Sequence, residues 1–441
     1  MTHVVPIRNA IGTNRTKGVP VADQETDQKT GQKTGQKTGD GQAVQGKEPL
    51  NVLMVAAALQ GRPFMTEIKR LGHNVYLLTG ETLLKEKWIR EDLKDIFGVP
   101  KLFDERQVRN VVSYLNRDIK FDRIVPVGDW EMEMCAFLRE HLRVPGMGET
   151  TVRYFRDKLA MRMKAAEDGI PIPEFTPLFN WKEIHEYIDR VPAPWILKAR
   201  QEAASMGLQK VRDRDDLWPR LDKLGDKMSL TLMEKFLPGD LYHVDSVIHD
   251  SGQVVFAAVN KYGTPMLKLT QEGGVFTTRT IERGSADEVA LQDLNKRVIK
   301  SMGLKRGVTH IEYIKADEDG KFYFLEAAAR VGAARIPDVV WYATDVCLWH
   351  EWARIEINQG PSPLGKMRDE YAGVALSISR DKEPDLSSFN DPEICFRQAR
   401  DYKAGLIVKS KDPNRVDELI QKYAERFQNE FMIHTPMPEG R

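Results

Sequence analysis

The spacing of apolar residues in the first third of the chain predicts strands that alternate with helices. An apolar run of strand length covers residues 51–56, and residues 62–71 follow with apolar side chains on one helical face. A second run covers residues 75–78. A third run, residues 123–127, precedes a helix that we expect at 131–141. Strands that alternate with helices in this way form an open parallel α/β sheet.

A different pattern at residues 310–330 predicts a β-hairpin. Two runs rich in Ile, Tyr and Phe flank a polar turn that ends in an Asp-Gly pair. A two-residue turn would pair Tyr313 with Glu326. A three-residue loop over residues 318–320, with the glycine left-handed, would instead pair Glu312 with Glu326.

The second of these registers would place two acids opposite each other. Cβ atoms of directly paired residues lie about 5 Å apart, where like charges are destabilising unless a cation lies between them. Carboxylate oxygens with room for water and phosphate suit Mg²⁺. Four residues after Glu326, Arg330 adds a planar cation suited to phosphate or carboxylate. The alternative is an exposed hairpin with solvated acids.

Two lysines upstream of the hairpin are candidates for phosphate contacts. Lys158 lies within a helix that we expect at 152–167, and Lys198 closes an apolar strand predicted at 195–198. The small residues of the loop 199–207 would let the backbone approach a phosphate and present N–H groups to it. Each feature alone has another interpretation. The charged residues of the helix could face solvent, and the loop could be a connection that binds no ligand.

A strand predicted at 229–233 leads into an extended segment that begins at Glu234 and ends before Pro238. Its backbone N–H and C=O groups can recognise an adenine edge, which offers one donor and one acceptor. The alternative is a charge at a strand end followed by an ordinary turn.

The rest of the pattern predicts further helices and strands. We expect helices at 286–302 and 339–358, separated by the hairpin. Apolar runs at 372–378 and 405–408, with a helix at 415–427, predict a small α+β unit at the carboxyl end.

Composition excludes several classes of protein. The 65 basic residues equal the 65 acidic ones, which argues against a nucleic-acid-binding tract or a polybasic membrane anchor. No apolar run has membrane-spanning length, and the amino terminus has no apolar signal-peptide core. Cys135, Cys347 and Cys395 lack metal-site or disulfide spacing. We therefore expect a cytoplasmic protein with reduced thiols that acts on small molecules.

Taken in chain order, these features resemble the ATP-grasp superfamily. The features are Lys158, Lys198, the small-residue loop, the segment 234–239 and the paired glutamates with Arg330. The resemblance covers about residues 49–435. It is closest to the branch of the carbamoyl-phosphate-synthase large chain and biotin carboxylase, and within it to L-amino-acid ligases.

The resemblance implies a multidomain α/β and α+β protein, with an ATP-grasp fold preceded by an open parallel α/β domain. The implied parts are a disordered tail at 1–48, a pre-ATP-grasp domain at 49–150, an ATP-grasp domain at 151–365 with a lid at about 190–236, and a small α+β unit at 366–441.

The resemblance also implies roles for individual residues in binding ATP and Mg²⁺ (or Mn²⁺). These are Lys158 and Lys198 on the phosphates, Glu202, Ser205 and Gly207 in the lid, Glu234, Phe236 and Leu237 at the adenine, Asp240 as the acid nearest the ribose, Glu312 and Glu326 on the metal, and Arg330, with Lys198, in catalysis.

The sequence departs from the family pattern at three places. Ala328 stands where many members have a metal-binding Asn, and amino-acid ligases often lack that Asn too. Leu241 stands where the ribose-binding acid is usual. Ala199 replaces a frequent proline after the second lysine, and the lid has one glycine where several are usual.

The implied activity is an ADP-forming carbon–nitrogen ligase. It would phosphorylate a carboxylate, such as that of an amino acid, and let an amine displace the phosphate. The alternatives are an ATP-grasp enzyme that uses bicarbonate or another acid, and a nucleotide-binding regulator with weak turnover. The expected partners are small carboxylates and amines, without nucleic acid or membrane, and a homo-oligomer is left open. Candidates for the acceptor pocket are Arg279, Arg335 and residues 260–266.

Overall fold

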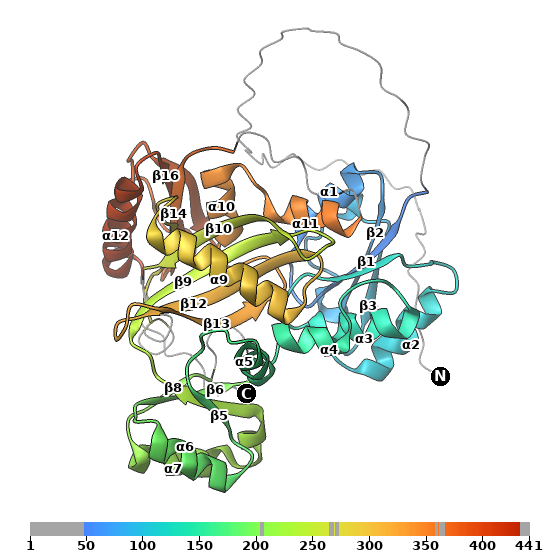
Figure 1. The fold of residues 1–441 in the computed structure, drawn as a ribbon. Helices are drawn as coiled ribbons and strands as arrows, with labels where there is room; N and C mark the ends of the chain where they lie inside the picture. Colours follow the sequence, from blue (N-terminus) through green and yellow to red (C-terminus); the bar gives the residue numbers. More distant parts are fainter. Residues whose placement is uncertain are drawn as a thin grey trace. The chain divides into compact units, whose positions relative to one another are not determined.

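The structure is a computed structural model. The described residues are 48–202, 207–263, 269, 273–357, 360 and 367–432. The predicted disordered tail, apart from Glu48, lies outside them. Everything that follows concerns the unit Leu50–Arg441, in which the helices and strands of Figure 1 lie.

The first part of this unit is a parallel four-stranded sheet in the order β3-β2-β1-β4, as the alternating pattern predicts. Strand β3 and helix α2 were not predicted. The elements are β1 (Asn51–Ala56), α1 (Arg62–Arg70), β2 (Asn74–Gly80), β3 (Asp95–Val99), α2 (Glu105–Leu115), β4 (Arg123–Pro126) and α3 (Met132–Leu142), with short 3₁₀ turns at Glu81–Leu83 and Arg90–Asp92.

The central sheet has eight strands in the order β13-β12-β9-β10-β11-β14-β16-β15, and all its pairings are antiparallel. The carboxyl-terminal strands therefore continue the sheet that carries the predicted hairpin. The strands are β9 (Gly239–Ile248), β10 (Val254–Tyr262), β11 (Phe276–Thr280), β12 (Gly307–Ala316), β13 (Phe322–Ala328), β14 (Tyr371–Ile378), β15 (Ile394–Arg400) and β16 (Lys403–Ser410).

Helices cover both faces of the central sheet (Figure 1). Helix α9 (Ala286–Met302) packs Leu291, Val298 and neighbouring residues onto β9, β10, β12 and β13. Helix α12 (Pro413–Glu430) covers β14 and β16. A smaller antiparallel sheet in the order β5-β8-β6-β7 carries its own two helices. Its elements are β5 (Phe175–Pro177), α6 (Trp181–Arg190), β6 (Trp195–Ala199), β7 (Gln209–Val211), α7 (Arg214–Leu224), a 3₁₀ turn at Gly225–Leu230 and β8 (Thr231–Lys235).

Two helices predicted as continuous are interrupted, so those two predictions were wrong. The segment 152–167 divides into α4 (Glu149–Val152), a 3₁₀ turn (Arg153–Phe155) and α5 (Lys158–Glu167). Asp157 is extended and caps α5, its carboxylate accepting from the Leu159 N–H at 3.0 Å. The segment 339–358 divides into α10 (Ile336–Thr344) and α11 (Leu348–Glu356), because Asp345 turns into the left-handed region at φ 69°.

The hairpin has the predicted glutamate pairing but not the predicted loop. Glu312 pairs with Glu326. The loop is four residues, 317–320, closed between Ala316 and Lys321, with Gly320 left-handed at φ 67°. A bulge at Leu325 on β13 restores the register, because Tyr313 pairs with Phe324 while Glu312 still pairs with Glu326. The three-residue loop was therefore wrong, and the bulge compensates for the difference.

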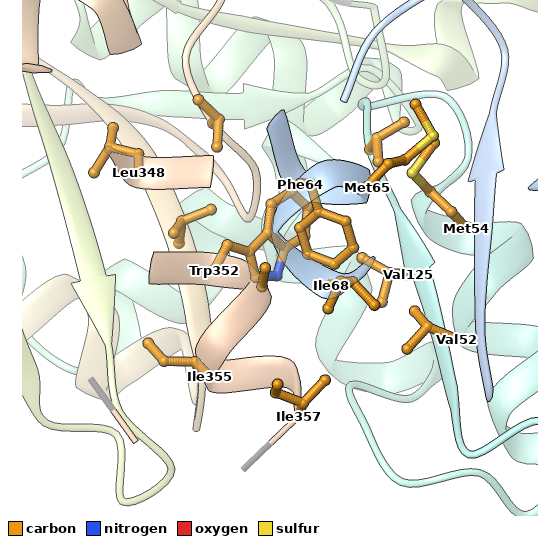
Figure 2. Packing of buried hydrophobic residues seen from close by; sticks show 14 of the residues in the cluster. Val52, Met54, Phe64, Met65, Ile68, Val125, Leu348, Trp352, Ile355 and Ile357 are labelled. Atoms are coloured by element: carbon orange, nitrogen blue, oxygen red, sulfur yellow. The ribbon is translucent and has the colours of Figure 1, made fainter. Parts of the chain in front are cut away.

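The parallel sheet and the central sheet share a hydrophobic core (Figure 2). Phe64 of α1 lies edge-on to Trp352 of α11, with ring centroids 5.3 Å apart. Beside them, Glu67 of α1 binds Arg354 of α11 at 2.8 Å. This packing fixes the loops that follow β1 and β4 relative to the hairpin. No described helix is long and apolar enough to cross a membrane.

Candidate functional site

Glu312 and Glu326 lie opposite each other on the β12–β13 hairpin, and each is held by a group from elsewhere. Tyr262 of β10 donates its hydroxyl to Glu312 at 2.8 Å. Lys158, the first residue of α5, donates its Nζ to Glu326 at 2.8 Å. Both carboxylates remain partly exposed, at 25% for Glu312 and 32% for Glu326. They are therefore positioned and still open to a ligand.

A buried chain of polar side chains lies behind Glu312. His310 contacts Glu312 at 3.6 Å and Asp245 at 2.9 Å, and Asp245 contacts His243 at 2.7 Å. Burial acts to lower the pKa of His310, but Asp245 and Glu312 outweigh it and raise that pKa to about 9. Burial would also raise the pKa of Glu312, but His310 and Tyr262 lower it to about 2. Glu312 is thus held ionised.

The group His243, Asp245 and His310 has ligand atoms within 4.8 Å of one another, close enough to hold a metal ion. The contacts just described, and that of the second His243 nitrogen to Thr278 at 2.7 Å, already occupy these ligand atoms. We therefore assign the group to supporting the hairpin.

Arg162 connects the hairpin to strand β8 and was not predicted. Its side chain is fully buried and binds one oxygen of Glu234 through two nitrogens, at 2.8 and 3.1 Å. Its remaining nitrogen donates to the carbonyl of Leu325, the bulge residue, at 2.6 Å. The sequence signal was its position four residues after Lys158 on one helix face.

Lys198, near the end of β6, forms a buried ion pair with the other oxygen of Glu234. Burial raises the pKa of Glu234, but Arg162 and Lys198 outweigh it and hold that pKa below its usual range. Burial lowers the pKa of Lys198, against the attraction of Glu234. The Glu234 side chain is therefore engaged by two cations, and only its backbone is available to a ligand.

Lys158 also connects the hairpin to the start of the predicted lid. Its Nζ donates to the Glu202 carbonyl at 2.7 Å, and its N–H donates to the Arg200 carbonyl at 2.9 Å. Gly207 lies at φ 73°, in the left-handed region that suits glycine. Ser205, predicted in the same lid, lies outside the described residues.

The predicted adenine segment follows β8. Lys235 and Phe236 donate their N–H groups to the carbonyls of Glu174 and Pro194, at 2.8 and 3.0 Å. Within the described chain, the Leu237 backbone forms no such hydrogen bond. The Leu237 N–H is thus left for a ligand. Asp240, the predicted ribose acid, lies in β9 and is ion-paired with Lys261 at 2.6 Å.

Arg330 is held by a residue of the parallel sheet. Asp129, from the loop between β4 and α3, accepts a hydrogen bond from the Arg330 Nε at 2.8 Å and forms an ion pair with its Nη2 at 2.7 Å. Burial lowers the pKa of Arg330, but Asp129 outweighs it and raises that pKa. Asp129 was not predicted as a site residue. Its signal was an acid that directly follows an apolar strand, at the edge of a parallel sheet where ligands bind.

The structure places the candidates for an acceptor pocket in different elements. Arg279 lies in strand β11 and is ion-paired with Asp417 at 2.5 Å. Arg335 lies directly before α10 at φ 66°. Of the segment 260–266, residues 264–266 lie outside the described part.

Known proteins are similar to this chain in sequence and in fold. An L-arginine-specific L-amino acid ligase of Bacillus subtilis is 24% identical over 249 residues, which cover 55% of this chain and 59% of the ligase. The chain thus spans less than two thirds of that relative. An L-amino acid ligase structure from Bacillus licheniformis superposes with TM-score 0.71 at 16% identity, covering 88% of this chain and 100% of that one.

A third similarity is the biotin carboxylase domain of a 2-oxoglutarate carboxylase from Hydrogenobacter thermophilus, described as a dimer with MgADP, ADP and bicarbonate. Its TM-score is 0.64 at 16% identity, covering 87% of this chain and 90% of that one. Residues 191–338 match the profile of the ATP-grasp domain. Residues 191–338 thus carry an ATP-grasp domain, and the chain has a fold similar to that of these ligase and carboxylase structures.

Proposed function

We propose that this protein is an ATP-dependent, ADP-forming carboxylate–amine ligase that acts on an amino acid or a similar small carboxylate. The observation that carries the proposal is the direct pairing of Glu312 with Glu326, with Lys158 and Arg330 beside them. Two carboxylates kept opposite each other and partly exposed offer oxygens that a metal cation can bind.

The residues present fit Mg²⁺ and ATP. Glu312 and Glu326 would hold the metal, because hard oxygen donors with open positions suit Mg²⁺. A bound Mg²⁺ would neutralise charge on the transferring phosphate. Lys158 and Lys198 would bind the phosphates, and the Leu237 N–H would meet the adenine edge. We include Asp240 at the ribose as part of the same proposal.

In this reaction the protein acts mainly by positioning the reacting groups. The substrate carboxylate oxygen bonds to the γ-phosphorus and the bond to ADP breaks. The amine nitrogen then bonds to the acyl carbon, inorganic phosphate leaves, and the amine loses a proton. Arg330 would bind the oxygens on which negative charge grows, and Asp129 keeps its guanidinium oriented.

A substrate screen for ADP release tests the proposal. The full chain with ATP and Mg²⁺ is incubated with pairs from a panel of amino acids, and a stimulated pair is then analysed for its coupled product. Glu326→Gln should abolish the stimulated ADP release. Glu318→Gln, which removes an exposed acid from the loop of the same hairpin, should leave it unchanged.

Three outcomes would change the proposal. Stimulation by bicarbonate alone, without an amine, would favour an enzyme that uses another acid. ATP binding without stimulated release from any pair would contradict the ligase and favour a nucleotide-binding regulator. Full activity of Glu326→Gln would contradict the metal assignment.

A further inference from the structure

A cavity of about 550 Å³ lies on the central sheet, away from the paired glutamates. We call it the sheet trough. Its floor and walls are formed by side chains from four neighbouring strands and from the segment before α10. The residues that matter here are Phe276, Leu376, Ile378, Gln398, Arg335 and Lys403.

One row of the sheet forms the floor of the trough. Phe276 pairs with Leu376, and both Leu376 and Gln398 pair with Gly405. The Leu376 side chain covers Gly405, because a Cβ atom there would lie 2.4 Å from a Leu376 methyl, so Leu376 provides the apolar surface of this row. Helix α10 covers the adjacent row through Val339, and it begins only at Ile336. The apolar floor beyond that point is therefore left open.

Cationic groups lie at the rim of this apolar floor. Arg335 is left-handed at φ 66°, and Ala334 before it has φ 51°. Non-glycine residues in this region are uncommon, and they are over-represented at ligand sites. The Arg335 guanidinium lies 4.6 Å from the ring centre of Phe396 and binds Gln398 at 3.2 Å. The conformation thus directs a rigid donor group into the trough.

The balance of charge favours an anion. Lys403 is exposed on the strand β16 side. The acid that faces Arg335 is Asp338, at 3.6 Å, and burial raises its pKa. The trough therefore has two cationic side chains and one partly buried acid. The amino end of α10 adds partial positive charge on the same side.

The trough is linked to the proposed reaction centre by short contacts. The ring of Phe276, in its wall, meets the ring of Tyr262 at 5.9 Å, and the Tyr262 hydroxyl binds Glu312 at 2.8 Å. Ala334 follows Arg330 by four residues, which span at most about 14 Å of extended chain. The trough therefore adjoins both the segment that follows Arg330 and the tyrosine that binds Glu312.

We propose that the sheet trough binds the amine substrate, and that this substrate is an α-amino acid with an apolar side chain and a free carboxylate. This inference rests on the proposed ligase function. The amine substrate keeps its carboxylate through the reaction, so that carboxylate needs a cationic partner at a distance from Arg330. Arg335 and Lys403 supply it, and Leu376 and Ile378 contact the apolar side chain.

Binding of matched ligands to the full chain, measured by calorimetry with ADP and Mg²⁺ present, tests this assignment. L-leucine, L-leucinamide and 3-methylbutylamine share the amine and the apolar group, and leucine alone has the carboxylate. Leucine should bind at least tenfold more tightly than the other two. Arg335→Gln should remove that preference, and Lys403→Gln should reduce it about threefold.

Arg397→Gln is the matched control. Arg397 precedes Gln398 on β15, so its side chain lies on the opposite face of the sheet. This variant should keep the preference for leucine. Thermal unfolding of each variant shows whether the fold is retained, and Lys403→Gln at an exposed position provides the test if Arg335→Gln unfolds.

Equal affinity of the unchanged protein for leucine and leucinamide, or no binding of leucine, would overturn the assignment. So would a leucine preference that survives both substitutions. If leucine binding depends on Arg335 but no acid–amine pair stimulates ADP release, the ligase proposal fails, and the trough remains an amino-acid-binding site without a role for an amine substrate. If ADP release is stimulated and Arg335→Gln leaves the KM of the amine unchanged, the trough assignment fails and the ligase stands.

Discussion

Arg162→Met gives a direct measure of how strongly the hairpin is tied to strand β8. The substitution leaves Glu234 buried with one cation fewer, and breaking a buried ion pair in this way costs about 3–5 kcal/mol. It also removes the donor to the Leu325 carbonyl, and an unsatisfied buried acceptor costs about 1–3 kcal/mol. The expected loss of unfolding free energy is the sum, about 4–8 kcal/mol.

Urea denaturation followed by circular dichroism measures this loss. With a slope of about 3 kcal/mol per molar urea, the midpoint should fall by at least about 1.3 M. Arg190→Met is the control, because Arg190 pairs with Glu174 on the surface, where the two side chains are 63% and 50% exposed. Exposed pairs contribute under about 1 kcal/mol, so its midpoint should move by less than about 0.3 M. An equal, small shift for both variants would refute the reasoning.

Three further predictions concern the site and its support. Asp129→Asn removes the charge that orients Arg330 and should lower kcat about 100-fold with the KM for ATP nearly unchanged; steady-state kinetics with a stimulated substrate pair measure this, and an unchanged kcat would contradict it. Tyr262→Phe removes the hydroxyl from Glu312 and should raise the Mg²⁺ concentration for half-maximal activity several-fold; an unchanged Mg²⁺ requirement would show that the hydroxyl does not position the carboxylate. Glu67 has its pKa lowered from 4.5 to about 2, chiefly by its hydrogen bond to Arg70. Because the folded pKa lies below the unfolded one, this stabilisation is present above pH 4.5 and is lost as the pH falls to 2, about 3 kcal/mol in all. Glu67→Gln should therefore destabilise the protein at pH 7 and flatten the decline of stability below pH 4.5, and an unchanged pH profile of urea unfolding would contradict this.

The glutamate pairing could be predicted from the sequence because the polar turn and the two apolar runs are local features. The length of the loop could not. The bulge at Leu325 depends on Arg162, which lies 163 residues earlier in the chain and supplies the donor for the freed carbonyl. A local pattern cannot include such a partner, so the three-residue loop was the simpler solution.

Helix ends were predicted poorly for a related reason. Apolar spacing continues through Asp157, and the side chain that caps α5 is the same residue that binds Arg200, 43 residues further along the chain. Asp129 was overlooked as a site residue because its partner, Arg330, lies 201 residues away. The site residues that could be predicted are the lysines, the paired glutamates and Arg330. Their side chains indicate phosphate or metal binding even when their distant partners are unknown.

The contact between Phe64 and Trp352 has a consequence for the proposed reaction centre, although we assign neither residue to it. Asp129 belongs to the sheet on one side of this core, and Arg330 belongs to the sheet on the other. The hydrogen bond between them tolerates a displacement of only a few tenths of an ångström. The apolar core therefore keeps Asp129 and Arg330 aligned, and a small change in its packing would misdirect a charge in the proposed site while leaving every charged residue in the sequence.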